Sequence, residues 1–217
     1  AGGLDDRGRD FLHALRVCIE AAGIWQGRYL DELDRRIAAA TPEQAEHYSR
    51  VRGNLAAVGD RRPRTFRQAV QALWLYFAFQ RLCGNWSGMG RVDCMLGPFL
   101  RRDLAAGEIT LGEAREWLAH FWIKGAEWLG SPGWRNGSGD AQYYQNVVLG
   151  GVDAEGRSVP EDVALLVMDV IEQLGINEYP VAVRVGEYTS DKLWGRIADV
   201  QRRGGGIVAV YNDRQMI

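Results

Sequence analysis

The chain has 217 residues and a formal net charge of −2 at pH 7, with 47% hydrophobic and 25% charged residues. This is an ordinary globular mixture that can bury a core, and its near-neutral charge excludes the basic footprint of a nucleic-acid-binding protein. No apolar run is long enough to span a bilayer, so we expect neither nucleic acid nor membrane as a partner.

The three cysteines, Cys18, Cys83 and Cys94, are not spaced as metal ligands or as a redox pair. An odd number of cysteines without a signal peptide is typical of reduced thiols. We therefore expect a cytoplasmic protein with no bound metal. The three histidines lie far apart in helical surroundings, and we interpret them as structural.

The first part of the chain is predicted to be helical. Residues 10–40 carry helical periodicity, which we expect to be broken near Gly23 and Gly27. Thr41-Pro42-Glu43-Gln44 predicts a second helix, because Thr41 and Gln44 have the spacing of a capping box and proline suits the first turn. Pro63 and Thr65 precede a third, strongly apolar helix that extends to about residue 82.

A glycine-rich stretch, GNWSGMGRVDCMLGPF at residues 84–99, follows this apolar helix. Its glycines permit tight backbone paths, and Arg91 and Asp93 are spaced to form a charge-assisted hydrogen bond. The alternative is a simple connector whose charged residues cap the neighbouring helices. A further capped helix is predicted from Thr110 and Glu113.

The last third of the chain alternates between predicted strands and helices. Strands are expected at residues 143–149, 180–185 and 207–211, with helices from Ser158 to Gly175 and from Ser190 to about Arg203 between them. This alternation predicts an α/β fold with parallel strands and helical crossovers. We therefore expect mostly helical scaffold over about 1–130 and strand–helix alternation over about 140–217.

Several segments, taken in order, resemble the glycyl radical enzymes, the pyruvate formate-lyase family with its dehydratase and lyase relatives. The matching segments are Arg64-Thr65-Phe66 with Ala69, Gln71 and Trp74; Gly90-Arg91-Val92-Asp93 through Pro98-Phe99; Asp103-Leu104 with Gly107 and Ile109-Thr110; Phe121 to Lys124; Gln145 to Asp153 with Gly156-Arg157; Val183-Arg184; and Tyr211-Asn212-Asp213. Each segment is weak by itself, and their order and spacing make the resemblance specific. It covers most of the chain, so residues 1–217 are expected to be part of one pyruvate formate-lyase-like domain.

The resemblance implies a ten-stranded α/β barrel that is incomplete in this chain. It also implies a protein-based glycyl radical, installed by a radical-SAM activating enzyme, and no other bound cofactor. In this family a thiyl radical on a cysteine abstracts a hydrogen atom from a small organic substrate, and the intact enzyme is expected to be a homodimer. The catalytic cysteine and the radical glycine are expected beyond Ile217, so we expect the 217-residue chain to be inactive alone.

The resemblance places three substrate-pocket candidates in this chain, Asn85, Trp86 and Tyr144. Asn85 and Trp86 stand where dehydratase-like members carry a His-Ser pair, which argues against a small-diol dehydratase. The alternatives are a capping asparagine, a core tryptophan and a core strand aromatic.

Four further residues are expected to shape loops: Arg91, Asp93, Asn212 and Asp213. The last two are expected to do so through Asx-type hydrogen bonds. The rival hypothesis for the whole chain is a non-catalytic α/β structural or interaction module that retains the scaffold. A cysteine loop and a glycyl loop encoded downstream would favour the enzyme.

Overall fold

A computed structural model describes residues 5–59, 61–82, 88–126, 146–176, 179–204 and 206–216. The chain divides into two compact units, residues 1–64 and 65–217, which are described separately.

The first unit is a helical hairpin of α1 (Asp6–Ala39) and α2 (Pro42–Ala56). The predicted break near Gly23 and Gly27 is wrong, because α1 runs through both positions without interruption. A glycine in a helix interior costs about 1 kcal/mol relative to alanine, which a helix of 34 residues tolerates.

Side-chain hydrogen bonds to backbone groups begin α2 and join it to α1. The predicted capping box is confirmed: the Gln44 N–H donates to Thr41 Oγ1 over 3.4 Å, and the Thr41 N–H donates to Gln44 Oε1 over 3.2 Å. Gln26 of α1 is buried and donates from Nε2 to the carbonyls of Leu55 and Val58, both at 2.6 Å. Gln26 thus adds side-chain hydrogen bonds to two carbonyls at and just after the end of α2.

The second unit begins with three helices, α3 (Phe66–Leu82), α4 (Val92–Ala105) and α5 (Leu111–Ala126). Asp103, near the end of α4, is 3% exposed, and its Oδ2 accepts from the backbone N–H of Phe66 over 2.6 Å. Because Phe66 opens α3, the carboxylate caps that helix from a neighbouring element.

Four parallel strands follow one another in the sheet in chain order: β1 (Gly90–Arg91), β2 (Val147–Gly150), β3 (Val181–Val185) and β4 (Val208–Asn212). The crossover helices are α7 (Asp162–Leu174) between β2 and β3 and α8 (Asp191–Arg202) between β3 and β4, and the short α9 (Asp213–Met216) follows β4. The predicted α/β class and parallel alternation are confirmed. Gly175 follows the last turn of α7 as its C-cap, in the left-handed conformation with φ 60° that glycine adopts readily.

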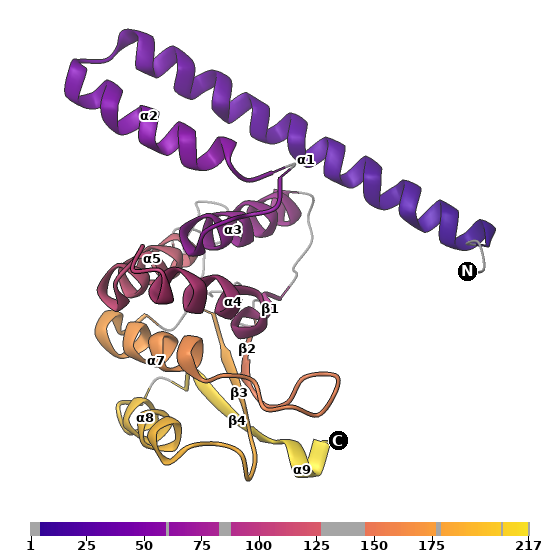
Figure 1. Cartoon of the computed structure of the whole chain (residues 1–217), viewed down its shortest axis with the longest axis vertical. Coiled ribbons are helices and arrows are strands. Elements are labelled where there is room, and N and C mark those ends of the chain that lie inside the picture. The colour runs from indigo at the N-terminus through magenta and orange to yellow at the C-terminus, as the bar shows by residue number, and fades with distance from the viewer. Residues whose placement is uncertain are drawn as a thin grey trace, which may run out of the picture. The chain divides into compact units, whose positions relative to one another are not determined.

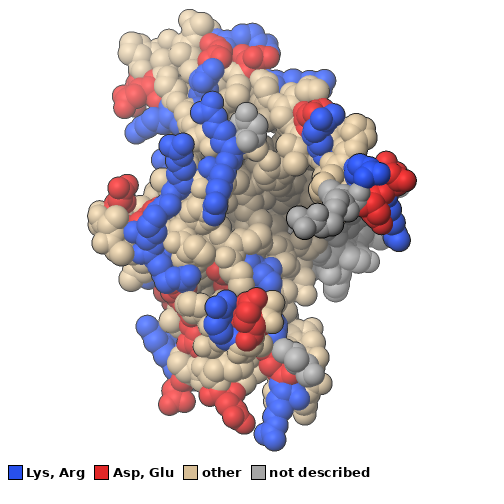
Figure 2. Space-filling model, turned by 45° about the vertical axis from the view of Figure 1, so that its right-hand side comes forward, with Lys and Arg blue, Asp and Glu red and all other residues tan. Residues whose placement is uncertain are grey.

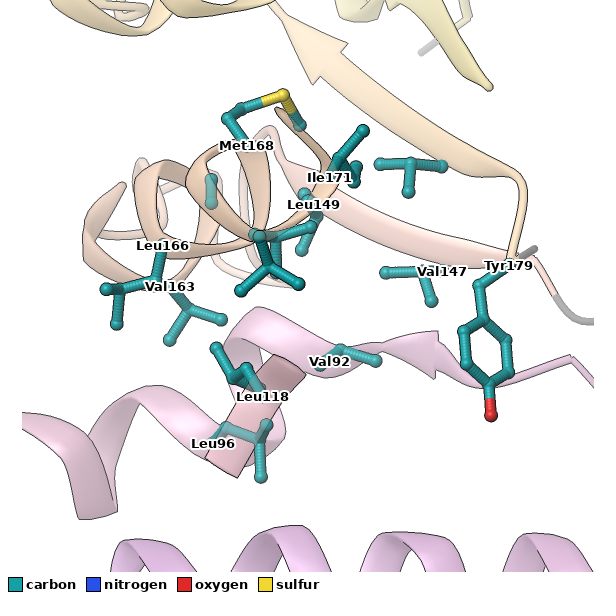
Figure 3. Close-up of a cluster of buried hydrophobic side chains, with 14 of the residues drawn as sticks. Val92, Leu96, Leu118, Val147, Leu149, Val163, Leu166, Met168, Ile171 and Tyr179 are labelled. Atoms are coloured by element: carbon teal, nitrogen blue, oxygen red, sulfur yellow. The ribbon is translucent and has the colours of Figure 1, made fainter. Parts of the chain in front are cut away.

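The two faces of this sheet differ in what covers them. Side chains alternate along a strand, so the register sorts the strand residues into two sets. One set packs in the main core with the helices: Val147, Leu149, Val181, Val183, Val185 and Val208. In Figure 3, residues of this set from β2 meet side chains of α4, α5 and α7. The opposite set, Arg91, Val148, Ala182, Arg184, Ala209 and Tyr211, takes no part in that core. Helices α7 and α8 lie on the same side of the strands (Figure 1).

The short strand β1 was not predicted from the sequence, and Cys94 was expected to lie in the glycine-rich stretch rather than in a helix. In the structure the backbone pairs with β2 at Gly90 and Arg91 and enters α4 at Val92, so Cys94 lies in the first turn of a helix. A two-residue strand carries no periodicity to detect, because it is defined by its neighbour in the sheet.

Acidic and basic side chains lie beside one another in several places on the face drawn in Figure 2. No helix within the described ranges is long and apolar enough to cross a membrane. Across those same ranges, no three His, Cys, Asp or Glu side chains are grouped so as to hold a metal ion.

Candidate functional site

The residues predicted to shape loops lie together at the carboxyl ends of the strands. Arg91 ends β1, Asp93 follows it in α4, Asn212 ends β4, and Asp213 opens α9. This edge of a parallel α/β sheet is where ligands bind in such folds. The pocket candidates Asn85, Trp86 and Tyr144 lie outside the described residues.

The first half of the cluster is built by Arg91 and Asp93. Arg91 Nε lies 3.3 Å from Asp93 Oδ1, and the same oxygen accepts from the Cys94 N–H over 2.8 Å. Asp93 Oδ2 accepts from the Gly150 N–H over 2.6 Å, and Arg91 Nη2 donates to the Gly150 carbonyl over 2.7 Å. The pair therefore holds both backbone polar groups of the residue that ends β2.

The second half is built by Arg184 of β3, Asp213 and Tyr188. Arg184 donates to Asp213 through two parallel contacts, Nε to Oδ1 at 2.7 Å and Nη2 to Oδ2 at 2.9 Å. This fork-to-fork arrangement is the strong geometry of an arginine–carboxylate pair. The Tyr188 hydroxyl donates to Asp213 Oδ2.

Both halves converge on the turn after β2. The carbonyl of Val152 accepts from Arg91 Nη1 and from Arg184 Nη1, each at 3.2 Å. Glycine is required at the two preceding positions, where φ is 70° and 79°. A Cβ on Gly150 would lie 2.5 Å from the Arg184 carbonyl oxygen, and one on Gly151 would lie 2.8 Å from the Arg184 guanidinium.

We call these five side chains the carboxyl-edge clamp: Arg91, Asp93, Arg184, Tyr188 and Asp213. Its carboxylates are nearly inaccessible, with 0% of the Asp93 side chain and 6% of the Asp213 side chain exposed. Burial by itself would raise the pKa of Asp213, but the hydrogen bonds from Arg184 and Tyr188 hold that pKa below its usual value. Burial, together with the bond to Asp213, raises the pKa of Tyr188 to about 12.

The clamp is charge-balanced, and its arginines are occupied. Each Arg91 nitrogen donates within the cluster, to Asp93, Val152 and Gly150, and each Arg184 nitrogen donates to Asp213 or Val152. Two arginines beside two carboxylates leave no net charge to attract an anion. The arrangement is suited to fixing the backbone at this edge.

Cys94 is the cysteine closest to the clamp in the chain. Partial desolvation and the neighbouring Asp93 carboxylate raise the pKa of the Cys94 thiol, which lowers the share of nucleophilic thiolate. Cys18 and Cys94 are both free and exposed.

A hollow of about 740 Å³ borders the clamp beside β4. Its walls include Tyr188 and Asp213 of the clamp, Trp194 of α8 and Val210 of β4. The Trp194 side chain is 42% exposed and Val210 is 37% exposed, so this edge presents apolar surface.

Sequence reasoning did not select Arg184 or Tyr188 as site residues. One signal was available: Arg184 interrupts an otherwise apolar strand, Val-Ala-Val-Arg-Val. A charged side chain in a buried strand requires a partner of opposite charge. That partner, Asp213, is 29 residues away along the chain, and only the sheet register brings the two together.

The fold and the clamp define an α/β protein with a parallel sheet whose polar residues are gathered at its carboxyl edge. A model of the family described as pyruvate formate lyase-like matches residues 3–217. The chain therefore belongs to the pyruvate formate lyase-like family, whose relatives here are glycyl radical enzymes, and the resemblance identified from the motifs is confirmed.

Two curated relatives illustrate the range of this similarity. The chain is 26% identical over 217 residues to isethionate sulfite-lyase of Nitratidesulfovibrio vulgaris, covering 96% of this chain and 26% of the relative. It is 23% identical over 214 residues to trans-4-hydroxy-L-proline dehydratase of Clostridioides difficile, covering 95% and 27%. The chain thus spans about a quarter of the length of these relatives.

Among solved structures, the chain is similar to a glycyl radical enzyme from Archaeoglobus fulgidus. The TM-score is 0.74 at 24% identity, over 90% of this chain and 26% of that chain. At this identity the likeness establishes the fold alone.

Proposed function

We propose that this chain is part of a glycyl radical enzyme, in which it supplies helical scaffold and one wall of the substrate cavity. The observation that carries this proposal is the sheet. Its four parallel strands are neighbours in chain order, and their crossover helices α7 and α8 share one face.

This topology favours a barrel. When each new parallel strand is added at the same edge of the sheet, right-handed crossovers place every connecting helix on the same face. A doubly wound sheet requires a reversal of strand order, and the described strands contain none. A twisted sheet extended in this sense closes on itself. We propose that the intact protein extends it to the ten-stranded barrel, with the Arg91–Tyr211 face inside.

The inner face supports a cavity because the side chains in the middle of β2, β3 and β4 are small, whereas Arg184 and Tyr211 lie toward its carboxyl end. Val148, Ala182 and Ala209 occupy its middle, and Gly150 lies at its end. A barrel whose interior is filled by protein carries bulky side chains at such positions. Small ones leave room for a substrate, with the clamp at the carboxyl end.

We infer the type of reaction from the glycyl radical enzymes to which the chain is similar. The intact enzyme would break or rearrange a carbon–carbon or carbon–heteroatom bond of a small organic substrate, after a thiyl radical removes a hydrogen atom. A radical-SAM activating enzyme would supply the backbone glycyl radical, at a residue outside this chain. Asn85, Trp86 and Tyr144 are proposed to border the substrate, and the active protein to be a cytoplasmic homodimer.

Anaerobic activation of the intact protein tests this function. The protein is incubated with its activating enzyme, S-adenosylmethionine and a reductant, and the organic radical is counted by electron paramagnetic resonance. Isethionate, trans-4-hydroxyproline and pyruvate with coenzyme A are then offered as representative substrates. We expect a glycyl radical signal and the consumption of one class. A protein that accepts no radical from an activase competent on a control enzyme would be a non-catalytic module.

A further inference from the structure

The chain leaves β4 through a turn that the clamp holds from one side. Asp213 is 5% exposed, whereas the next three residues of α9 are exposed. Arg214 reaches Glu187 only at 3.7 Å, with both side chains more than four-fifths exposed. The Arg214 N–H donates to Asn212 Oδ1 over 3.0 Å, which shapes the turn locally. The Asp213 carboxylate is therefore the strongest described link between this turn and the rest of the sheet.

Several hydrogen bonds hold that carboxylate in place. It accepts two bonds from Arg184 and one from Tyr188. These donors come from β3 and from the loop after it, so two separate segments constrain Asp213.

Arg184 also connects the two ends of the described sheet. The Val152 carbonyl accepts from Arg184 and from Arg91, which ends β1. A displacement of Asp213 would therefore move Arg184 away from the Val152 carbonyl and loosen the turn that Arg91 and Asp93 hold. The carboxyl edge from β1 to β4 behaves as one cross-linked unit.

We propose that Asp213 is a positioning residue: held by Arg184 and Tyr188, it fixes the direction in which the polypeptide leaves β4 and thereby places the catalytic segment that follows. This inference rests on the proposed function, in which the cysteine-bearing segment comes after residue 217. Asp213 acts through that segment and does not itself touch the substrate. A misplacement of about 1 Å in a reacting group lowers turnover by about a hundredfold.

The test compares variants of the intact protein by turnover per glycyl radical. Asp213→Asn keeps the shape of the side chain and removes its charge, and Tyr188→Phe removes one donor. Asp162→Asn is the matched control. Asp162, the first residue of α7, also accepts two contacts from one arginine, Arg101 of α4, but it takes no part in the clamp.

We expect Asp213→Asn to lower kcat per radical by about tenfold to a hundredfold with KM within twofold, since the reacting groups are misplaced while substrate binding is retained. Tyr188→Phe should show a smaller loss of the same kind, and Asp162→Asn none. If Asp213→Asn does not fold, Tyr188→Phe still decides the outcome.

Two results would overturn the inference separately from the function. In one, both clamp variants match Asp162→Asn in turnover per radical. In the other, their activity falls only in proportion to their radical content, which is what a loss of folded protein would produce. A wild-type protein that accepts no radical overturns the proposed function itself.

Discussion

At the scale of single residues, the glycines after β2 show how backbone and clamp depend on one another. Gly151 has φ 79° and lies under the Arg184 side chain, whereas Gly156 has φ 77° with nothing within 4 Å of a Cβ. An alanine would be strained by the positive φ at both positions, but only at Gly151 would its Cβ also clash with the Arg184 side chain.

Alanine substitutions at these two glycines should separate strain from contact. Gly156→Ala should lower the free energy of unfolding by about 1 kcal/mol, the cost of a left-handed non-glycine residue. Gly151→Ala should cost about 2–4 kcal/mol, because it must also displace Arg184 from Asp213. Urea denaturation of the intact protein measures both. Equal losses would mean that the Arg184 contact contributes nothing.

The Asp213 carboxylate should make part of the stability depend on pH. Its pKa is lowered in the folded state, so the unfolded chain binds its proton more readily. The stabilisation is complete above the ordinary carboxyl pKa of about 3.9 and is lost as the pH falls through the lower folded value. The difference in urea midpoint between wild type and Asp213→Asn should be constant above about pH 5 and shrink below about pH 4. A difference that grows on acidification would contradict the lowered pKa.

Trp86 is the pocket candidate whose role can be separated most clearly from packing. Trp122 is 0% exposed in the core, so Trp122→Ala should lower the free energy of unfolding by about 3–5 kcal/mol. If Trp86 borders a substrate cavity, Trp86→Ala should cost much less and shift activity toward bulkier substrates. Unfolding free energy and substrate range are measured on the same intact variants. A loss as large as that of Trp122→Ala with unchanged substrate preference would place Trp86 in the core.

At the scale of elements, ion pairs join the helices that cover the sheet. Arg196 of α8 donates to Asp169 of α7 over 2.9 Å and also contacts Glu172. Its side chain is 24% exposed. Arg202, six residues further along α8, pairs within its own helix with Asp199 and is 78% exposed.

Truncation of these two arginines should therefore have different effects. Arg196→Ala should lower the free energy of unfolding by about 1–2 kcal/mol, because it removes one partner from each of two partly buried carboxylates, which keep only Arg115 and Arg203. Arg202→Ala should change it by less than about 0.5 kcal/mol, as exposed pairs do. Thermal or urea unfolding of the intact variants provides the comparison. A larger effect at Arg202 would show that the α7–α8 contact does not depend on Arg196.

Helix starts could be predicted from the sequence because their signals are local. Thr110 and Glu113 cap α5 reciprocally, with bonds of 2.8 Å and 3.2 Å, as their spacing predicted. The clamp could be predicted only in part. Arg91 and Asp93 are two residues apart and could be paired from the sequence, but Arg184 meets Asp213 only through strand pairing. The predicted helix break at Gly23 and Gly27 was wrong because the low helix propensity of single glycines does not interrupt a helix as long as α1.

At the scale of the whole molecule, the described sheet has an uncovered face and an open edge. Tyr211 of β4 is 40% exposed on that face, and β4 pairs on one side only among the described strands. The chain spans about a quarter of its curated relatives, so three quarters of their length has no counterpart here.

The isolated 217-residue chain should therefore behave differently from the intact protein. Unpaired strand edges and apolar surface promote association. We expect the isolated chain to aggregate or to bind a hydrophobic dye strongly at neutral pH, and to show no lyase, dehydratase or acetyltransferase turnover with an activating enzyme present. Sedimentation and dye fluorescence measure the first, and a coupled assay the second. A monomer with sharp cooperative melting and weak dye binding would show that the chain is self-sufficient.

The central claim is that the helix-free face of this sheet borders the substrate. An experimental structure of the intact protein with its substrate or a substrate analogue bound tests it most directly. We expect a closed barrel in which the ligand lies against the face that carries Val148, Ala182 and Ala209, with the Arg184–Asp213 pair intact at its carboxyl edge. A sheet with helices on both faces, or a ligand bound on the side of α7 and α8, would contradict it.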